Sequence, residues 1–147
     1  MENEYNLSRI GKLLRENKVR KTHDMIVYLF QLWLEKKGVP LKNMIILDEY
    51  KGLSPDIIVF NNNRVVSSVW EIIEPDPQWD INNETVREKL EKMLIRAYAR
   101  VYSPRVIVLS DGMSMFIYDS SGKLLYRISD LSKINRKKEK QIEEMVL

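Results

Sequence analysis

Residues 54–75, which read SPDIIVFNNNRVVSSVWEIIEP, decide the fold of this chain. Two runs rich in isoleucine and valine, residues 56–60 and 64–73, flank a turn of three asparagines. Apolar runs joined by turn residues are typical of a β-hairpin. Asp56 opens the first strand and Glu71 interrupts the apolar run of the second, so a hairpin expected in the core carries two acidic side chains.

The alternation of side chains along a strand sorts the second run into two faces. One face carries Val69, Glu71 and Ile73, and the other carries Trp70, Ile72 and Glu74. Glu74 therefore points away from Glu71. Asp56 lies beside Glu71 in one of the registers open to an antiparallel pair.

The segments on either side of the hairpin predict helices and further strands. Helices are expected at residues 5–16, 24–38 and 84–102, and strands at residues 44–50, 105–109, 113–119 and 124–129. Thr22 and Asn83 are the expected N-caps of the second and third helices. Since a helix between two neighbouring strands joins them in parallel, the element order predicts a mixed α/β sheet flanked by helices.

Apolar spacing predicts how these helices pack. The helix at residues 24–38 is apolar almost all round, which predicts a buried central element. The predicted buried stripe of the helix at residues 84–102 consists of Val86, Leu90, Met93, Leu94, Ala97 and Val101. Residues 132–147 are expected to form a charged C-terminal helix or a partly frayed end.

Composition indicates one globular domain over residues 1–147, because 44% of the chain is apolar and 31% is charged. The absence of cysteine excludes disulfides and thiolate metal sites, and no apolar run is long enough for a signal segment or a membrane span. An intracellular, cytoplasmic protein is therefore expected. The formal net charge of +3 permits nucleic-acid binding only if one face concentrates the positive charge.

Two carboxylates held close together in a partly buried place repel one another and are poorly solvated. A divalent cation resolves both problems, and the Ile72 carbonyl is a candidate third oxygen ligand. With His23 as the only histidine, such a site is built from oxygen ligands, which suit magnesium, manganese or calcium. The alternative is that Asp56 caps a turn after Pro55 and that Glu71 is an ordinary exposed strand residue.

The ordered set of segments resembles the restriction-endonuclease-like PD-(D/E)XK nuclease superfamily, and more narrowly the N-terminal nuclease domain of type I restriction enzyme R subunits. RKTHDMIVYLFQLWLEKKGVP is similar to the first helix of that family, and SPDIIVF with VVSSVWEIIEP is similar to its catalytic hairpin. SPRVIVLSDGMSMFIYD is similar to the strand, turn and strand after the crossover helix. The resemblance covers roughly residues 20–119 and implies a restriction-endonuclease-like mixed β-sheet flanked by helices.

The resemblance implies hydrolysis of DNA phosphodiester bonds with a bound Mg²⁺ or Mn²⁺. Asp56 and Glu71 would hold the metal, and Asp24 stands where the family often has an additional glutamate. Many nucleases of the superfamily cut both strands as dimers, so a homodimer is one implied arrangement. The lysine of the family motif falls at Ile73, which cannot stabilise charge on a phosphate.

Two interpretations of the missing lysine stay open. In the first, a cation of the helix at residues 84–102 replaces it, because Lys89, Arg96 and Arg100 recur on one side of that helix. In the second, the fold has lost catalysis and serves as a nucleic-acid-binding or partner-binding module. A solvated basic helix face is the alternative for these three residues. A third hypothesis is an unrelated α/β domain whose acids are structural.

Three further features have two interpretations each. His23, next to Asp24, is either a catalytic base or a residue at a helix start with no chemical role. Trp79 stacks on a nucleic-acid base or packs over a sheet edge. The tail segment INRKKEK contacts phosphates or makes a solubilising helix.

Overall fold

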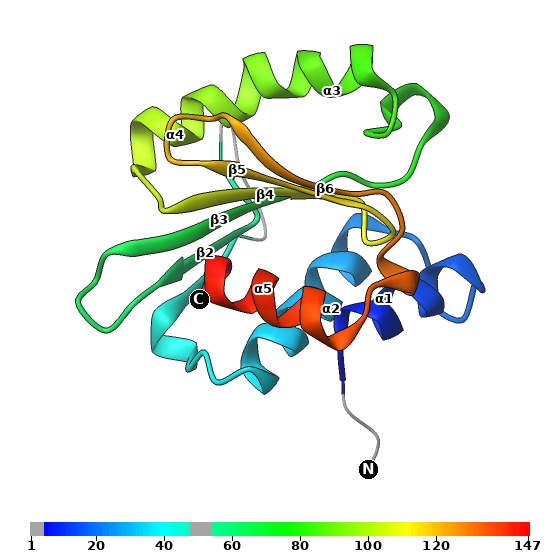
Figure 1. Cartoon of the computed structure of the whole chain (residues 1–147), viewed down its shortest axis with the longest axis horizontal. Helices are drawn as coiled ribbons and strands as arrows, with labels where there is room; N and C mark the ends of the chain where they lie inside the picture. The colour runs from blue at the N-terminus through cyan, green and yellow to red at the C-terminus, as the bar shows by residue number, and fades with distance from the viewer. Residues whose placement is uncertain (1–4, 48–53) are drawn as a thin grey trace.

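A six-stranded mixed sheet forms the middle layer of the computed structural model, which describes residues 5–47 and 54–147 (Figure 1). The strands lie in chain order, β1-β2-β3-β4-β5-β6. Their bounds are β1 Met44–Ile46, β2 Ile57–Phe60, β3 Val66–Ile72, β4 Val106–Ser110, β5 Met115–Asp119 and β6 Leu124–Ile128. All neighbours are antiparallel except β3 and β4, which run parallel as the crossover helix predicts.

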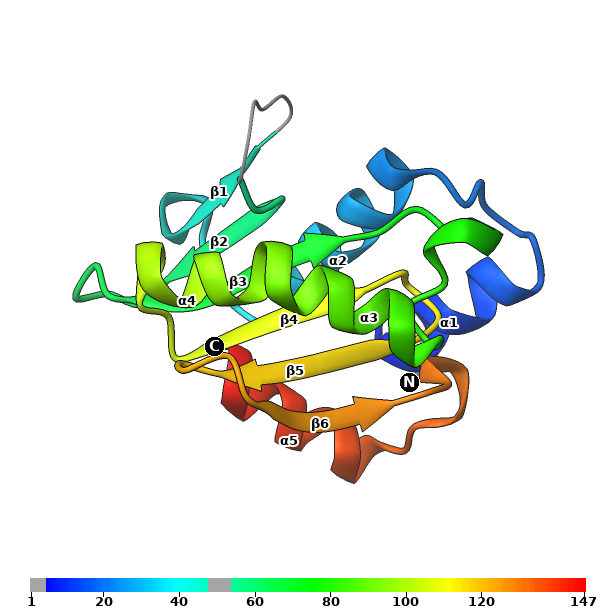
Figure 2. The same cartoon turned by 90° about the horizontal axis from the view of Figure 1, so that it is seen from above.

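Helices cover both faces of the sheet (Figures 1 and 2). One face carries α1 (Leu7–Arg15), α2 (His23–Lys36) and α5 (Arg136–Val146). The other face carries the crossover helix, which comprises α3 (Glu84–Leu90), a π-helical turn (Glu91–Ile95) and α4 (Arg96–Tyr102). The α/β class with a mixed sheet flanked by helices is therefore confirmed.

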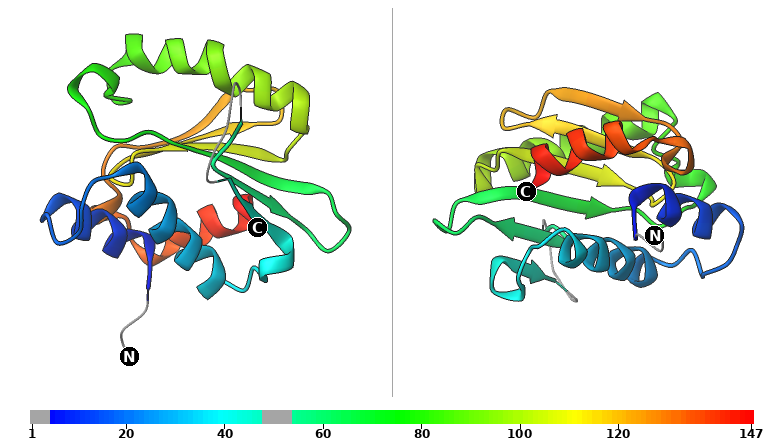
Figure 3. Two further views of the ribbon diagram at one scale, coloured as in Figure 1. Left: turned by 180° about the vertical axis from the view of Figure 1, so that it is seen from behind. Right: turned by 60° about the horizontal axis from the view of Figure 1, so that its bottom comes forward.

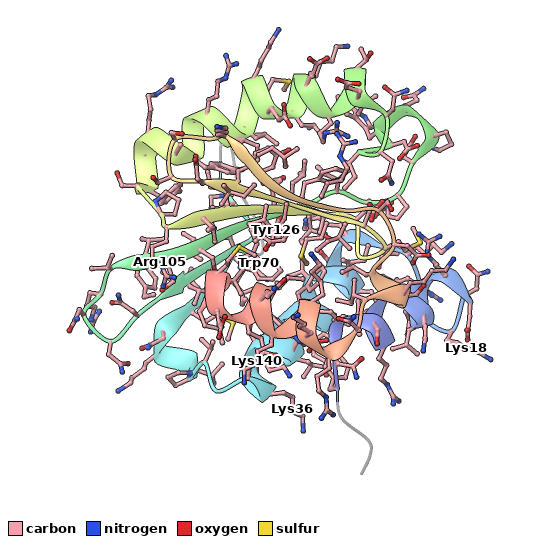
Figure 4. The ribbon with its side chains drawn as sticks, viewed as in Figure 1. Lys18, Lys36, Trp70, Arg105, Tyr126 and Lys140 are labelled. Atoms are coloured by element: carbon pink, nitrogen blue, oxygen red, sulfur yellow. The ribbon has the colours of Figure 1, made fainter. Side chains whose placement is uncertain are left out.

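Each face of the sheet has its own apolar core, and Trp70 shows how the strand alternation sorts them (Figure 4). Its ring lies 5.2 Å from that of Phe30 and 6.2 Å from that of Trp33, centroid to centroid, in the layer of α2. Val69 is buried on the opposite side, against the crossover helix, and Ile73 packs there as well. The predicted division of β3 into two faces is confirmed.

The predicted element positions hold to within a few residues. The Thr22 hydroxyl accepts from the Met25 N–H and the Asn83 side chain accepts from the Val86 N–H, so both predicted N-caps are confirmed. The first strand spans Met44–Ile46, whereas the part of its prediction at residues 48–50 lies outside the described residues. No helix in the described ranges has the length and hydropathy needed to cross a bilayer.

The predicted buried stripe of the crossover helix is wrong at its C-terminal half. Met93 is 54% exposed and Val101 is 70% exposed, while Ile95 and Tyr98 are buried. The π-helical turn Glu91–Ile95 is the physical reason, because its wider turn rotates every later residue relative to an uninterrupted α-helix. The rotation turns Tyr98 toward the sheet.

The charged C-terminal segment forms an ordered helix. In α5, Ile142 and Val146 are fully buried, and the Glu139 side chain is buried with them. The Glu139 carboxylate accepts from the Leu7 backbone N–H at 2.9 Å and from the Trp33 indole N–H at 3.0 Å. Of the two interpretations of residues 132–147, the helix is therefore the one that the structure adopts.

Candidate functional site

The β2–β3 hairpin brings the two predicted acids together. Ile57 pairs with Trp70 in the antiparallel register, so the next two residues outward, Asp56 and Glu71, lie opposite one another. Burial is the main cause that raises the pKa of Glu71, and the negative charge of Asp56 adds to the rise. Of the registers open to the hairpin, the structure has the one that places the backbones of Asp56 and Glu71 opposite one another.

Asp56 is almost fully buried, at 3% exposure, and both of its oxygens are engaged. Oδ2 accepts from the Ile72 backbone N–H at 2.7 Å, and Oδ1 lies 2.8 Å from Nε2 of His23. Because buried carboxylates need such partners, the strand and α2 together hold the Asp56 side chain in one orientation.

Glu71 is half-buried and points toward the crossover helix. Its Oε1 accepts a hydrogen bond of 2.6 Å from the Tyr98 hydroxyl. Tyr98 is only 1% exposed, and it reaches the sheet because the π-helical turn brings it to the inner side of the helix. The sequence-based interpretation missed Tyr98 because it assumed an uninterrupted α-helical period.

His23 links α2 to the acid pair. Its Nε2 lies 2.8 Å from Asp56 Oδ1 and its Nδ1 lies 3.2 Å from Asp24 Oδ1. Both ring nitrogens can donate only in the charged imidazolium, so the geometry favours a positive His23. Its backbone N–H, at the start of α2, donates to Glu74 Oε1 at 2.7 Å. His23 is thus a residue of the site, and its adjacency to Asp24 was the only sequence signal.

The pKa values follow from this arrangement. Burial raises the pKa of Glu71 to about 8, and the charge of Asp56 adds to the rise, while the Tyr98 hydrogen bond and His23 oppose it. The hydrogen bond to Asp56 raises the pKa of His23 to about 9, although burial opposes this. Near neutral pH, Glu71 therefore readily holds a proton and His23 carries positive charge.

The other predicted acidic ligand lies at the edge of the site. The Asp24 side chain is 98% exposed and is connected to Asp56 only through the His23 ring. Glu74 points away from Glu71, as the strand alternation predicts, and accepts from the helix start instead. Asp24 could thus assist metal binding only from the solvent side of His23.

The structure does not bring Lys89 or Arg96 to the acid pair. Both side chains are exposed on the outer side of the crossover helix, as is Arg100. Arg96 lies instead against the β5–β6 turn, where its Cγ would be 3.9 Å from a Cβ added to Gly122. Besides burial, the groups that shift the pKa of Glu71 within residues 5–47 and 54–147 are Asp56, Tyr98 and His23 rather than a lysine or arginine. The prediction that one of these cations replaces the motif lysine is corrected, because the helix directs Tyr98 at the site.

The inward-pointing cation of that helix is Arg87, which is 4% exposed and has a structural role. Its guanidinium lies 4.6 Å from the centroid of the Phe116 ring, and Nη1 donates to the Ile81 carbonyl at 3.0 Å. These contacts fix the loop before α3.

Trp79, in the loop before α3, is 41% exposed, so part of its side chain is open to solvent.

The donor set suits a hard divalent cation. Asp56 and Glu71 supply four carboxylate oxygens, and each oxygen has two lone pairs, so a hydrogen-bonded oxygen can still bind a cation. The raised pKa of Glu71 reflects its burial first and the negative charge of Asp56 second. Within residues 5–47 and 54–147 no three Asp, Glu or His side chains gather as a metal-holding group. Backbone oxygen or water would have to complete the coordination.

Replacing Tyr98 with phenylalanine is expected to raise the pKa of Glu71 further, by about one unit. The lost hydrogen bond stabilises the ionised carboxylate, and a bond to a charged group contributes about 1.5–3 kcal/mol. A carbon-detected NMR titration of the Glu71 carboxyl measures the shift. Tyr102→Phe is the control, because it removes a hydroxyl one helical turn away; equal titration curves for wild type and Tyr98→Phe would contradict the prediction.

Comparison of the sequence with family models identifies no matching family, and comparisons with curated proteins and with solved structures give no significant match. Functional inference therefore rests on the residues of the site.

Proposed function

We propose that the protein is a metal-dependent endonuclease that hydrolyses phosphodiester bonds in DNA. Asp56 and Glu71 hold a magnesium or manganese ion in this proposal. The observation that carries it is the placement of a buried carboxylate, Asp56, opposite a half-buried one, Glu71, whose pKa burial and the charge of Asp56 raise to about 8. Such a pair, in which the ion pair of His23 compensates Asp56 rather than Glu71, is costly to the fold unless it serves a function.

A divalent cation at this pair would supply the acidity that makes water nucleophilic at neutral pH and the positive charge that stabilises a phosphate. The residues of the chain have supporting roles. The Ile72 N–H and the His23 ring orient Asp56, and the Tyr98 hydroxyl orients Glu71. In this proposal His23 also provides positive charge beside Asp56, in place of the motif lysine of the nuclease family that the sequence resembles.

Plasmid nicking in Mg²⁺ or Mn²⁺ tests the proposal. The wild-type protein is expected to nick supercoiled DNA, and EDTA is expected to stop the nicking because it removes the metal. Glu71→Gln preserves the shape of the side chain and an acceptor for Tyr98 but removes the charge. We expect it to lower the nicking rate by at least about 100-fold, since loss of one electrostatic group in a catalytic site costs about that much.

The matched control is Glu88→Gln, which makes the same chemical change at an exposed position of α3. Its nicking rate should equal that of the wild type. Calorimetric titration with Mn²⁺ gives a second readout, because binding should release a proton from Glu71 and so vary with the buffer. Nicking that survives Glu71→Gln with unchanged Mn²⁺ binding would reject the proposal.

The second candidate function is a non-catalytic nucleic-acid-binding or partner-binding module on the same fold. It is favoured by the substitution of Ile73 for the motif lysine and by the ion pair of His23 with Asp56, which already compensates one of the two acids. DNA binding without nicking in either metal would support it.

A further inference from the structure

Positive charge is strongly segregated along this chain. Residues 5–22 and 131–146 together carry eleven lysines or arginines and four glutamates. Since the whole chain has 24 basic and 21 acidic residues, all other positions together are net negative. The modest overall charge of +3 therefore conceals two basic segments.

The fold joins the two basic segments into one surface. At Gly11 the helix α1 approaches the 3₁₀ helix η4 (Leu131–Lys133) so closely that a Cβ there would lie 2.5 Å from the Ser132 nitrogen. The Leu7 N–H reaches Glu139 of α5 at the other end of α1. Figure 3 shows α1 and α5 on the same side of the sheet. We call the outer side of α1, the following loop, η4 and α5 the basic surface.

Most of the cations on this surface are available to a ligand. Arg15 is paired with Asp130, the other carboxylate oxygen of Asp130 lies 4.0 Å from Lys133 Nζ, and the Lys138 ammonium lies 4.6 Å from the centroid of the Tyr126 ring. Other lysines and arginines project into solvent, as Figure 4 shows for Lys18 and Lys140. The exposed members are Arg9, Lys12, Lys18, Arg20, Lys133, Lys137 and Lys140.

The basic surface is continuous with the acid pair. The loop that carries Lys18, Arg20 and Lys21 leads directly into α2, whose first residue is His23. His23 in turn contacts Asp56. The loop cations Lys18, Arg20 and Lys21 therefore lie within five residues of the histidine that contacts Asp56.

The crossover helix on the opposite face is a weaker candidate. Residues 84–102 carry five basic and three acidic residues, so like charges are not concentrated there. Its exposed side also includes Met93 and Val101. If a polyanion binds the basic surface, it contacts the lysines of α1 and α5; if it binds the crossover helix, it contacts the lysines of residues 84–102.

The chemistry of the basic surface distinguishes between polyanions. Helices that bind membranes expose an apolar face, yet none of the large hydrophobic residues found exposed among the described residues lies at residues 5–22 or 131–147. Single strands bind to exposed aromatic rings, whereas Tyr5 donates to the Leu29 carbonyl and Tyr126 is covered by Lys138. A surface that exposes cations but no aromatic ring or large apolar side chain suits the phosphate backbone of a duplex.

We propose that the basic surface formed by α1, the following loop, η4 and α5 binds the phosphate backbone of duplex DNA and leads it to the acid pair. Binding there is independent of sequence and strongly dependent on salt. The link to cleavage rests on the proposed function, whereas the binding itself does not require it.

Fluorescence anisotropy with a short labelled duplex in EDTA tests this inference. The triple variant Lys12→Gln, Lys137→Gln, Lys140→Gln should weaken binding at least about tenfold, and the slope of log K against log salt should become shallower by about two to three. The matched control is Lys89→Gln, Lys92→Gln, Arg96→Gln, which removes the same charge from the crossover helix and should change the affinity by less than about twofold. All six positions are exposed, so both variants should fold.

Three outcomes would overturn the inference: equal loss of affinity in the two triple variants, tighter binding of a single-stranded oligonucleotide than of the duplex, or binding to phosphatidylserine vesicles without duplex binding. Glu71→Gln separates the two proposals. It should retain duplex affinity in EDTA even if nicking fails in every variant.

Discussion

Replacing Glu139 with alanine is expected to lower the free energy of unfolding by about 3–5 kcal/mol, which is a large fraction of the stability of a domain this size. The carboxylate accepts from the Leu7 N–H and the Trp33 indole, and Lys37 Nζ lies 3.2 Å from it. Alanine would leave two buried donors without partners, and each such donor costs about 1–3 kcal/mol. Lys37 would keep its ion pair with Glu143 at 3.1 Å.

Urea unfolding followed by circular dichroism measures this change. The control is Glu144→Ala on the same helix, where the side chain is exposed and the expected change is within about 0.5 kcal/mol. Equal midpoints for the two variants would mean that α5 is not docked through Glu139. Because Glu139 links α5 to α1 and α2, its loss should also weaken duplex binding at the basic surface.

Replacing Ile73 with lysine is expected to raise the rate of Mg²⁺-dependent nicking by about 100-fold, the usual value of one electrostatic group that stabilises a transition state. Ile73 lies on the same face of the β3 strand as Glu71, two residues further along, and its backbone N–H is fixed by the Ser110 carbonyl at 2.9 Å. A lysine side chain can keep its stem against the apolar core and extend its ammonium group toward the pair.

Ile73→Met is the control for this gain, because it changes shape and flexibility at the same position without adding charge. The double variant Ile73→Lys, Glu71→Gln should be as inactive as Glu71→Gln alone. A rate for Ile73→Lys no higher than that of Ile73→Met would show that a missing cation does not limit the site. Quantified nicking of supercoiled plasmid, with matched protein and metal concentrations, measures all four proteins.

Local signals in the sequence were sufficient to predict the positions of most helices and strands. The asparagine turn, the caps at Thr22 and Asn83 and the period-two alternation in β3 depend on neighbouring residues, and the structure has each of them. The π-helical turn at Glu91–Ile95 has no such local signal, so the orientation of Tyr98 could not be predicted. The same turn explains why the predicted stripe with Met93 and Val101 was wrong.

The candidate site likewise combines residues that local sequence patterns predict with contacts that depend on the packing of distant elements. Asp56 and Glu71 were identifiable because acids in an apolar hairpin are unusual, and strand alternation limits where they can point. The contact of His23 with Asp56 joins residues 33 positions apart, and it depends on how α2 packs against the end of the sheet. Lys89 and Arg96 were selected for their spacing, but spacing alone does not say which side of a helix meets the sheet.

Local patterns in the amino-acid sequence were enough to predict the α/β class, the hairpin and its two acids, because hydrophobic periodicity and turn chemistry act over a few residues. The contact of His23 with Asp56, the hydrogen bond of Tyr98 to Glu71 and the approach of α5 to α1 through Glu139 became visible only in the folded chain. Those arrangements depend on packing between distant elements, and that packing is set by the shape of the whole core.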